Sequence, residues 1–156
     1  MKALIQRVRR GRVSVDGQET GSIGQGLVIL LGVMPEDDER IADYLADRCA
    51  GLRIFEDEAG KMNRSLLDIG GGALVVSQFT LCADLSAGRR PSFSGAAKPE
   101  LADKLYIRFK EALARLGVEV ASGIFAADML VEIENDGPVT MMLETFINAS
   151  GKPALR

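Results

Sequence analysis

The chain has 156 residues, of which 19 are Lys or Arg and 22 are Asp or Glu, so its net charge is −3 at pH 7. A hydrophobic content of 47% is enough for a folded core and excludes a disordered chain, and the length fits one domain. The absence of histidine excludes a Ser-His-Asp or Cys-His triad, a histidine-ligated zinc site and an imidazole general base. If the protein is an enzyme, another group must act as its base.

Three further features of the composition narrow the function. Aromatic residues make up 5% of the chain, which disfavours a stacking platform for single-stranded nucleic acid. The mildly acidic charge argues against broad DNA binding but allows a local basic patch. Cys49 and Cys82 lack metal-ligand spacing and are expected to be reduced thiols, and no apolar run reaches the ~18 residues of a membrane span. We therefore expect a cytoplasmic protein with no metal, no cofactor, and no membrane or DNA partner.

Short apolar runs between turn residues predict most elements as strands, and two longer stretches with apolar residues every three or four positions predict helices. The predicted strands span residues 2–15, 19–23, 27–33, 52–56, 73–76, 118–121, 129–134 and 139–146. The first helix follows Pro35 and ends near Gly51, and the second starts at Pro99 and ends at Gly117. Residues 83–98 are expected to form a loop.

The apolar residues also predict which surfaces are buried. Residues 27–33 and 73–76 are almost continuously apolar, which favours buried central strands. The predicted helix stripes are Ile41, Leu45 and Cys49 in the first helix and Leu101, Leu105, Phe109, Leu113 and Leu116 in the second. We therefore expect one α+β domain with a mixed or largely antiparallel sheet at residues 1–147, followed by a C-terminal tail at residues 148–156.

Polar residues follow the second buried run, in the segment Ser77-Gln78-Phe79-Thr80-Leu81. Strand ends often carry site residues on a rigid scaffold. Hydroxyl and amide side chains occur here, and the backbone N–H groups could face an oxyanion. The alternative is an ordinary strand end whose side chains bond to nearby backbone. Without a histidine, Thr80 could act as a nucleophile only if a lysine, a carboxylate or the substrate activated it.

The segment Asn135-Asp136-Gly137-Pro138-Val139-Thr140 is rich in turn-forming residues and predicts a β-turn between two strands. A functional interpretation requires a cis Gly137-Pro138 bond, which would redirect the neighbouring carbonyl groups. Because cis forms account for roughly 5–6% of X-Pro bonds in folded proteins, the sequence alone does not predict one.

A set of arginines forms the third motif, and its members are Arg7, Arg9, Arg10, Arg12, Arg89 and Arg90. Strand alternation places Arg7 and Arg9 on one face and Arg10 and Arg12 on the other. Two interpretations stay open, namely a solvated face and a patch that contacts phosphate groups.

The order and number of these short motifs resemble those of the D-aminoacyl-tRNA deacylase family, formerly called D-tyrosyl-tRNA deacylases. The resemblance covers nearly the whole chain and stops at about Phe146. It rests on residues 1–8, 32–33, 53–55, 60–63, 77–81, 90–93, 125–129 and 135–140. It implies a single domain in which barrel-like layers of sheet pack against two main helices.

The family hydrolyses the ester between a D-amino acid and the terminal adenosine of tRNA, and it also removes glycine misattached to tRNA. The resemblance implies a homodimer that binds the 3′ end of aminoacyl-tRNA in a pocket near each subunit interface. One wall of the pocket would be formed by Ser77, Gln78, Phe79 and Thr80. The other would be a cis Gly137-Pro138 segment from the partner subunit, whose carbonyl groups hold the amino group and leave no room for an L side chain.

The resemblance also implies how hydrolysis proceeds without a histidine. The 2′-hydroxyl of the terminal ribose would assist, and backbone N–H groups near Phe79 would stabilise the oxyanion. An older alternative makes Thr80 the nucleophile. Met129 and Phe125 either line the pocket or pack in the core, and Arg7 either braces the Gly-Pro segment or is a plain surface arginine.

Two other classes of function stay open. One is a hydrolase of small esters that uses Thr80 or Ser77, which would cleave model esters as readily as aminoacyl-tRNA. The other is a noncatalytic dimeric binding module, which would show no turnover.

Overall fold

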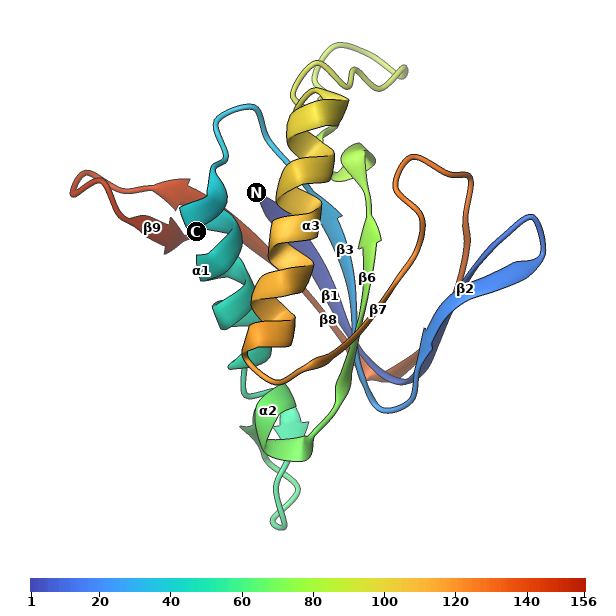
Figure 1. The fold of residues 1–156 in the computed structure, drawn as a ribbon. Helices are drawn as coiled ribbons and strands as arrows, with labels where there is room; N and C mark the ends of the chain where they lie inside the picture. Colours follow the sequence, from blue (N-terminus) through green and yellow to red (C-terminus); the bar gives the residue numbers. More distant parts are fainter.

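In the computed structural model, which describes residues 1–156, one large sheet is covered on one face by two helices (Figure 1). The sheet has seven strands in the order β7-β6-β3-β1-β8-β9, with β2 pairing with β1 off this path. Its strands are β1 (Lys2–Val15), β2 (Gln18–Ile23), β3 (Gly26–Gly32), β6 (Gly72–Ser77), β7 (Glu119–Ser122), β8 (Leu130–Ile147) and β9 (Pro153–Leu155). The other elements are α1 (Glu39–Ala50), α2 (Leu66–Ile69), the 3₁₀ turn η1 (Phe79–Cys82), α3 (Pro99–Arg115), and the hairpin of β4 (Phe55–Glu56) and β5 (Met62–Arg64). The expected α+β class is confirmed.

Two cores lie on opposite faces of the sheet, because successive side chains of a strand alternate. The larger has 25 buried residues and joins β1, β3 and β6 to α1 and α3. The smaller has six, namely Val8, Val13, Ile23, Val28, Leu74 and Val76. Around the smaller core β2 curls toward β7, and a Cβ at Gly21 would lie 2.8 Å from the Ser122 carbonyl oxygen. This close approach gives the sheet the expected barrel-like curl.

The second main helix begins where the sequence predicts, whereas the first begins at Glu39, four residues after Pro35, and both bury most of the predicted stripes. α1 follows Asp38, whose carboxylate accepts a hydrogen bond from the Ile41 N–H at 3.1 Å, and α3 starts at Pro99. The fully buried stripe residues are Ile41, Leu45 and Cys49 in α1 and Leu105, Phe109 and Leu113 in α3. Leu101 is only partly buried, and Leu116, which follows the last residue of α3, is exposed. None of the helices is both long and apolar enough to cross a membrane.

The predicted turn at residues 135–138 is wrong, because β8 is one continuous strand that pairs with β1 on both sides of it. The β1–β8 register shifts next to Arg7, and the Gly137-Pro138 peptide bond at this irregularity is cis. The Asn135 side-chain amide donates hydrogen bonds to the carbonyl groups of Arg7 at 3.0 Å and Val139 at 3.1 Å. These bonds stand in for ladder bonds lost at the irregularity, so that the strand continues through a proline.

Two other local expectations also need correction, and one short helix was not expected. Residues 153–155 of the expected tail form β9 and pair with β8, so the end of the chain is part of the sheet. The predicted strand at residues 52–56 is reduced to the two residues of β4. The helix α2 was not predicted, because its four residues are too few for a periodic pattern, although Ser65 and Asp68 cap it reciprocally.

Candidate active site

The site starts where β6 leaves the sheet. Ser77 is paired with Leu31 of β3, and the Gln78 N–H still donates to the Leu31 carbonyl at 2.8 Å before the chain turns into η1. The buried Cys82 anchors the end of η1, with its Sγ 3.6 Å from the Val33 carbonyl oxygen. Backbone pairing on one side and a buried thiol on the other thus fix the path of residues 77–82.

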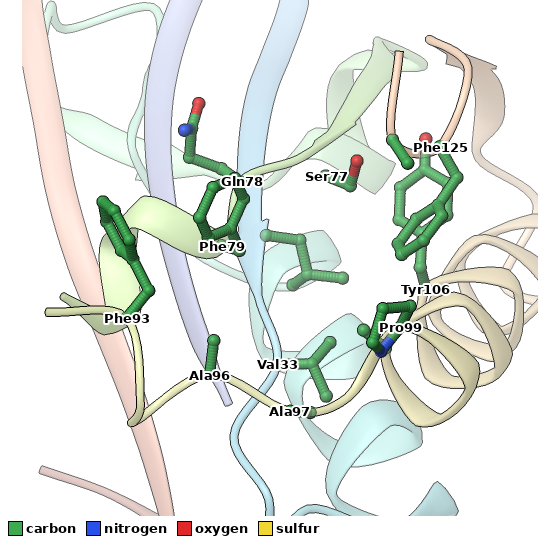
Figure 2. Close-up of a pocket in the computed structure, with 13 residues that line it drawn as sticks. Val33, Ser77, Gln78, Phe79, Phe93, Ala96, Ala97, Pro99, Tyr106 and Phe125 are labelled. Atoms are coloured by element: carbon green, nitrogen blue, oxygen red, sulfur yellow. The ribbon is translucent and has the colours of Figure 1, made fainter.

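A cavity of about 410 Å³ opens beside this strand end (Figure 2). Four parts of the chain form it: the strand ends of β3 and β6, the loop that leads into α3, the first turns of α3, and the segment before β8. Its lining residues are Leu31, Val33, Ser77, Gln78, Phe79, Phe93, Ala96, Ala97, Pro99, Ala102, Tyr106, Phe125 and Ala126. Ten of these 13 residues are hydrophobic, so the cavity suits a ligand group with a large apolar surface.

Two aromatic pairs lie on opposite sides of the cavity in Figure 2. The Phe79 and Phe93 rings are 5.0 Å apart in an edge arrangement, and the Tyr106 and Phe125 rings are 6.0 Å apart. These four rings are half of the eight aromatic residues in the chain. The low aromatic content therefore does not argue against stacking at this site, because the few aromatic residues are concentrated here.

Tyr106 is held by its hydroxyl group, which donates to the Val75 carbonyl at 2.9 Å. Burial raises the pKa of Tyr106, so the phenol stays protonated at neutral pH and is a donor rather than a base. The sequence did not indicate that Tyr106 and Phe93 line this cavity. Neither position carries a local signal, since the fold alone brings α3 and the loop at residues 83–98 beside the end of β6.

A second, smaller cavity of about 240 Å³ lies on the other side of the Ser77–Phe79 segment. It is lined by Val76, Ser77, Gln78, Phe79, Ala126, Ala127, Asp128, Met129 and Val131. The structure therefore places Phe125 at the larger cavity and Met129 at the smaller one, and the two cavities share Ser77, Gln78, Phe79 and Ala126. Asp128 is the only carboxylate among the residues that line either cavity.

Thr80 differs in position from Ser77, Gln78 and Phe79, which line the cavities. Its side chain is exposed and it lines neither cavity, and its hydroxyl accepts a hydrogen bond from the Gln78 side-chain amide. No lysine or carboxylate is hydrogen-bonded to Thr80. The geometry gives this hydroxyl no base and no access to a bound group in either cavity.

Gly137 and Pro138 line neither cavity and lie instead among polar groups. The nearly buried Arg7 donates to the Ile54 carbonyl at 2.7 Å and to the Asp136 carbonyl at 3.3 Å, and its Nε is 3.1 Å from the Asp136 carboxylate. A Cβ on Gly137 would lie 3.1 Å from the Arg7 guanidinium. Arg7 therefore packs against the Gly-Pro segment rather than extending into solvent.

The two predicted walls of the pocket are not brought together within one chain. Ser77 is in register with Leu31, and Leu31 with Ala3 of β1, whereas Gly137 lies on β8 beside Arg7. Four residues along β1 and three strand spacings separate the two places. At about 3.4 Å per residue and about 4.8 Å per strand, the separation is about 20 Å. A ligand in either cavity is therefore out of reach of the Gly137-Pro138 segment of the same chain.

No group of three or more Cys, Asp or Glu side chains is arranged to hold a metal ion. Burial raises the pKa of the Cys49 thiol to about 12. Cys49 lies in the main core rather than at either cavity, so it takes no part in the site.

Comparison with known proteins identifies the family. Residues 4–144 match the family described as D-Tyr-tRNA(Tyr) deacylase. A D-aminoacyl-tRNA deacylase of Symbiobacterium thermophilum is 56% identical over 145 residues, which cover 93% of this chain and 96% of that protein. One from Geobacter sulfurreducens is 54% identical over 150 residues, which cover 96% of this chain and 99% of that protein.

Two solved structures share the fold. One described as c-Myc DNA Unwinding Element Binding Protein has a TM-score of 0.86 and 40% identity, and the match covers 92% of this chain and 98% of that one. One described as a probable eukaryotic D-amino acid tRNA deacylase has a TM-score of 0.80 at 17% identity, covering 90% and 97%. With the family match over residues 4–144, these similarities lead to one conclusion: the chain belongs to the D-Tyr-tRNA(Tyr) deacylase family.

Proposed function

We propose that this protein hydrolyses the ester bond of D-aminoacyl-tRNA and releases the free D-amino acid and tRNA. The observation that carries the proposal is the position of Ser77–Phe79, which lies inside the region matched by the family and borders two adjoining cavities at the end of a buried strand. The reaction would remove wrongly charged D-amino acids before translation, in the cytoplasm.

The two cavities suit the two ends of the scissile ester. The larger, apolar cavity has aromatic rings on opposite sides and fits the planar base of the terminal adenosine. The smaller cavity, with Met129 on its wall, takes the aminoacyl end. The Ser77–Phe79 segment between them lies beside the ester carbonyl.

The reaction needs little side-chain chemistry from the protein. Water attacks the ester carbonyl, an oxyanion forms, and the 3′-oxygen of the ribose leaves. The larger cavity has no side chain that can act as a base, because its single titratable group, Tyr106, stays protonated. The 2′-hydroxyl of the ribose assists the attack, and backbone N–H groups near Phe79 stabilise the oxyanion. The Gln78 side chain does not cap the backbone N–H groups at the start of η1, and its amide group contacts the Thr80 hydroxyl instead, which leaves these N–H groups available.

The second wall comes from a partner subunit in a homodimer. The separation of about 20 Å within one chain supports this arrangement, since a Gly137-Pro138 segment can reach the cavities only from another copy. Its backbone carbonyl groups hold the α-amino group and exclude an L side chain. Glycine has no side chain to exclude, so glycine mischarged on tRNA is also a substrate.

The test compares D-Tyr-tRNA, L-Tyr-tRNA, Gly-tRNA and a simple D-Tyr ester under the same conditions. We expect rapid release from D-Tyr-tRNA and Gly-tRNA and negligible release from the other two. Equal cleavage of all four would instead favour a general hydrolase of small esters. No release from any of them would leave a noncatalytic dimeric module as the better description.

A further inference from the structure

The six arginines of the sequence motif separate into two groups in the structure. Arg7 and Arg9 both contact the Asp136 carboxylate, and Arg12 contacts Glu132. Arg10, Arg89 and Arg90 are exposed and form no ion pair with a carboxylate. Three of the four arginines of β1 are therefore paired with carboxylates of the same chain, whereas both arginines of the loop at residues 83–98 are free to bind a ligand.

The charge of this loop differs from that of the rest of the molecule. Residues 83–98 contain three cations, Arg89, Arg90 and Lys98, against one carboxylate, Asp84, which gives a net charge of +2 in a chain whose net charge is −3. Hydrogen bonds from Ser86 lower the pKa of Asp84, which is therefore ionised at neutral pH and is counted in this balance. Lys98 also forms no ion pair.

The same loop forms one side of the larger cavity. Phe93, Ala96 and Ala97 line it, and Lys98 follows directly (Figure 2). Arg90 is three residues before Phe93, and three residues of chain span at most about 10 Å. The free cations therefore flank the lining segment on both sides in the sequence, within a few residues of Phe93 and Ala97.

We propose that the loop at residues 83–98 binds the phosphate groups of the single-stranded RNA immediately 5′ of the terminal adenosine, with Arg89 and Arg90 as the main contacts. This inference rests on the proposed function, because it needs a nucleoside in the larger cavity. The phosphodiester that enters the cavity and the one before it then lie beside the loop. Phe93, which is 42% exposed, offers a ring edge on the same path.

A net negative protein needs such a local patch to bind a polyanion. Contacts to phosphate groups release counterions, so the affinity for single strands falls with salt by a slope of about 0.7 per contact in a double-logarithmic plot. Two arginine contacts would therefore account for a slope of about 1.4. These contacts position the substrate and do not take part in the chemical step.

The experiment compares two substrates that differ in their phosphates, D-Tyr-tRNA and 3′-O-D-tyrosyl-adenosine. The variant is Arg89→Ala/Arg90→Ala. Its matched control is Arg48→Ala/Lys152→Ala, which removes two other exposed cations that form no ion pair. We expect the loop variant to raise KM for D-Tyr-tRNA on the order of 10-fold at low salt and to flatten the salt slope by about 1.4. Its kcat, and its kinetics on the nucleoside ester, should equal those of wild type.

Each other outcome counts against the inference. Unchanged KM and salt slope for D-Tyr-tRNA would overturn it while leaving the proposed function intact, and so would equal losses on both substrates or equal losses in the control variant. A wild-type protein that hydrolyses neither substrate would overturn the proposed function and this inference with it. The charge-preserving variant Arg89→Lys/Arg90→Lys should recover most of the affinity, which a purely structural role of the arginine side chains would not predict.

Discussion

Replacing Gly137 by alanine tests the Gly-Pro wall directly. Gly137 has a φ of +115°, which L residues rarely adopt, and the added Cβ would lie 2.8 Å from Val139 Cγ2 and 3.1 Å from Arg7 Nη2. Backbone strain of this kind costs about 1–3 kcal/mol. We expect the free energy of unfolding to fall by about that amount and Tm by about 2–4 °C per kcal/mol. The methyl group would also shift the segment, and a displacement of about 1 Å at a substrate-positioning group can cost on the order of 100-fold in kcat/KM.

The control for this variant is Gly60→Ala. Gly60 also has a positive φ, +73°, but its Cβ would meet nothing within 4 Å. It should lose a comparable part of its stability and keep its activity on D-Tyr-tRNA. Kinetics of Gly137→Ala equal to those of wild type, or an equal loss in Gly60→Ala, would refute the reasoning that places Gly137 at the site.

Mixed dimers test whether the Gly-Pro segment acts on the partner's site. Gly137→Ala is co-expressed with Phe79→Ala, which damages the opposite wall. If each site combines Phe79 of one subunit with Gly137 of the other, half of the random dimers are mixed and each has one intact site. Activity should then return to about one quarter of the wild-type value per subunit, a consequence of two-fold symmetry. Activity that stays at the average of the two parent variants would exclude a site shared between subunits.

Three further substitutions test individual residues. Thr80→Ala should deacylate D-Tyr-tRNA at close to the wild-type rate, because the hydroxyl lines neither cavity; a fall of several orders of magnitude in kcat would make it catalytic. Tyr106→Phe removes the buried hydrogen bond to Val75 and should lower the free energy of unfolding in urea by about 1 kcal/mol, whereas an unchanged midpoint would contradict the bond. The hydrogen bond from Arg108 lowers the pKa of Asp43 below 3.8, so this stabilisation is complete above pH 3.8 and is lost as the pH falls through the lowered pKa. Asp43→Asn should therefore be less stable than wild type by under about 1 kcal/mol at pH 7 and equally stable in strong acid, and a constant difference across that range would contradict the ion pair.

Much of the fold could be predicted from the sequence where the signal is local. The face of α1 that carries Ile41 and Leu45 and the buried runs of β3 and β6 follow directly from the spacing of apolar residues. The continuity of β8 could not be predicted in this way. Asn135 and Gly137 have the local preferences of a turn, and only the long partner strand β1, together with hydrogen bonds from the Asn135 side chain, keeps the strand extended.

The residues that line the candidate cavities could be predicted only in part, for the same reason. Ser77 and Phe79 stand out because polar and exposed residues follow a buried strand in the sequence. Tyr106 and Phe93 give no such signal, since they become part of the site only when α3 and the loop before it pack beside β6. The composition was misleading here, because 5% aromatic residues is a low average that conceals four rings around one cavity.

The lining of the cavity bears on how the proposed reaction could proceed without a histidine. The larger cavity offers apolar surface, backbone groups and one phenol kept protonated by burial, and the neighbouring Thr80 hydroxyl has no base. The residues of the larger cavity need not supply a base for an ester with an adjacent 2′-hydroxyl, because such a substrate carries its own assisting group. In the proposed mechanism, selectivity would depend on fit and exclusion rather than on reactive side chains. Because the excluding segment and the cavities are about 20 Å apart in one chain, chiral selection and dimerisation would be a single property of this fold.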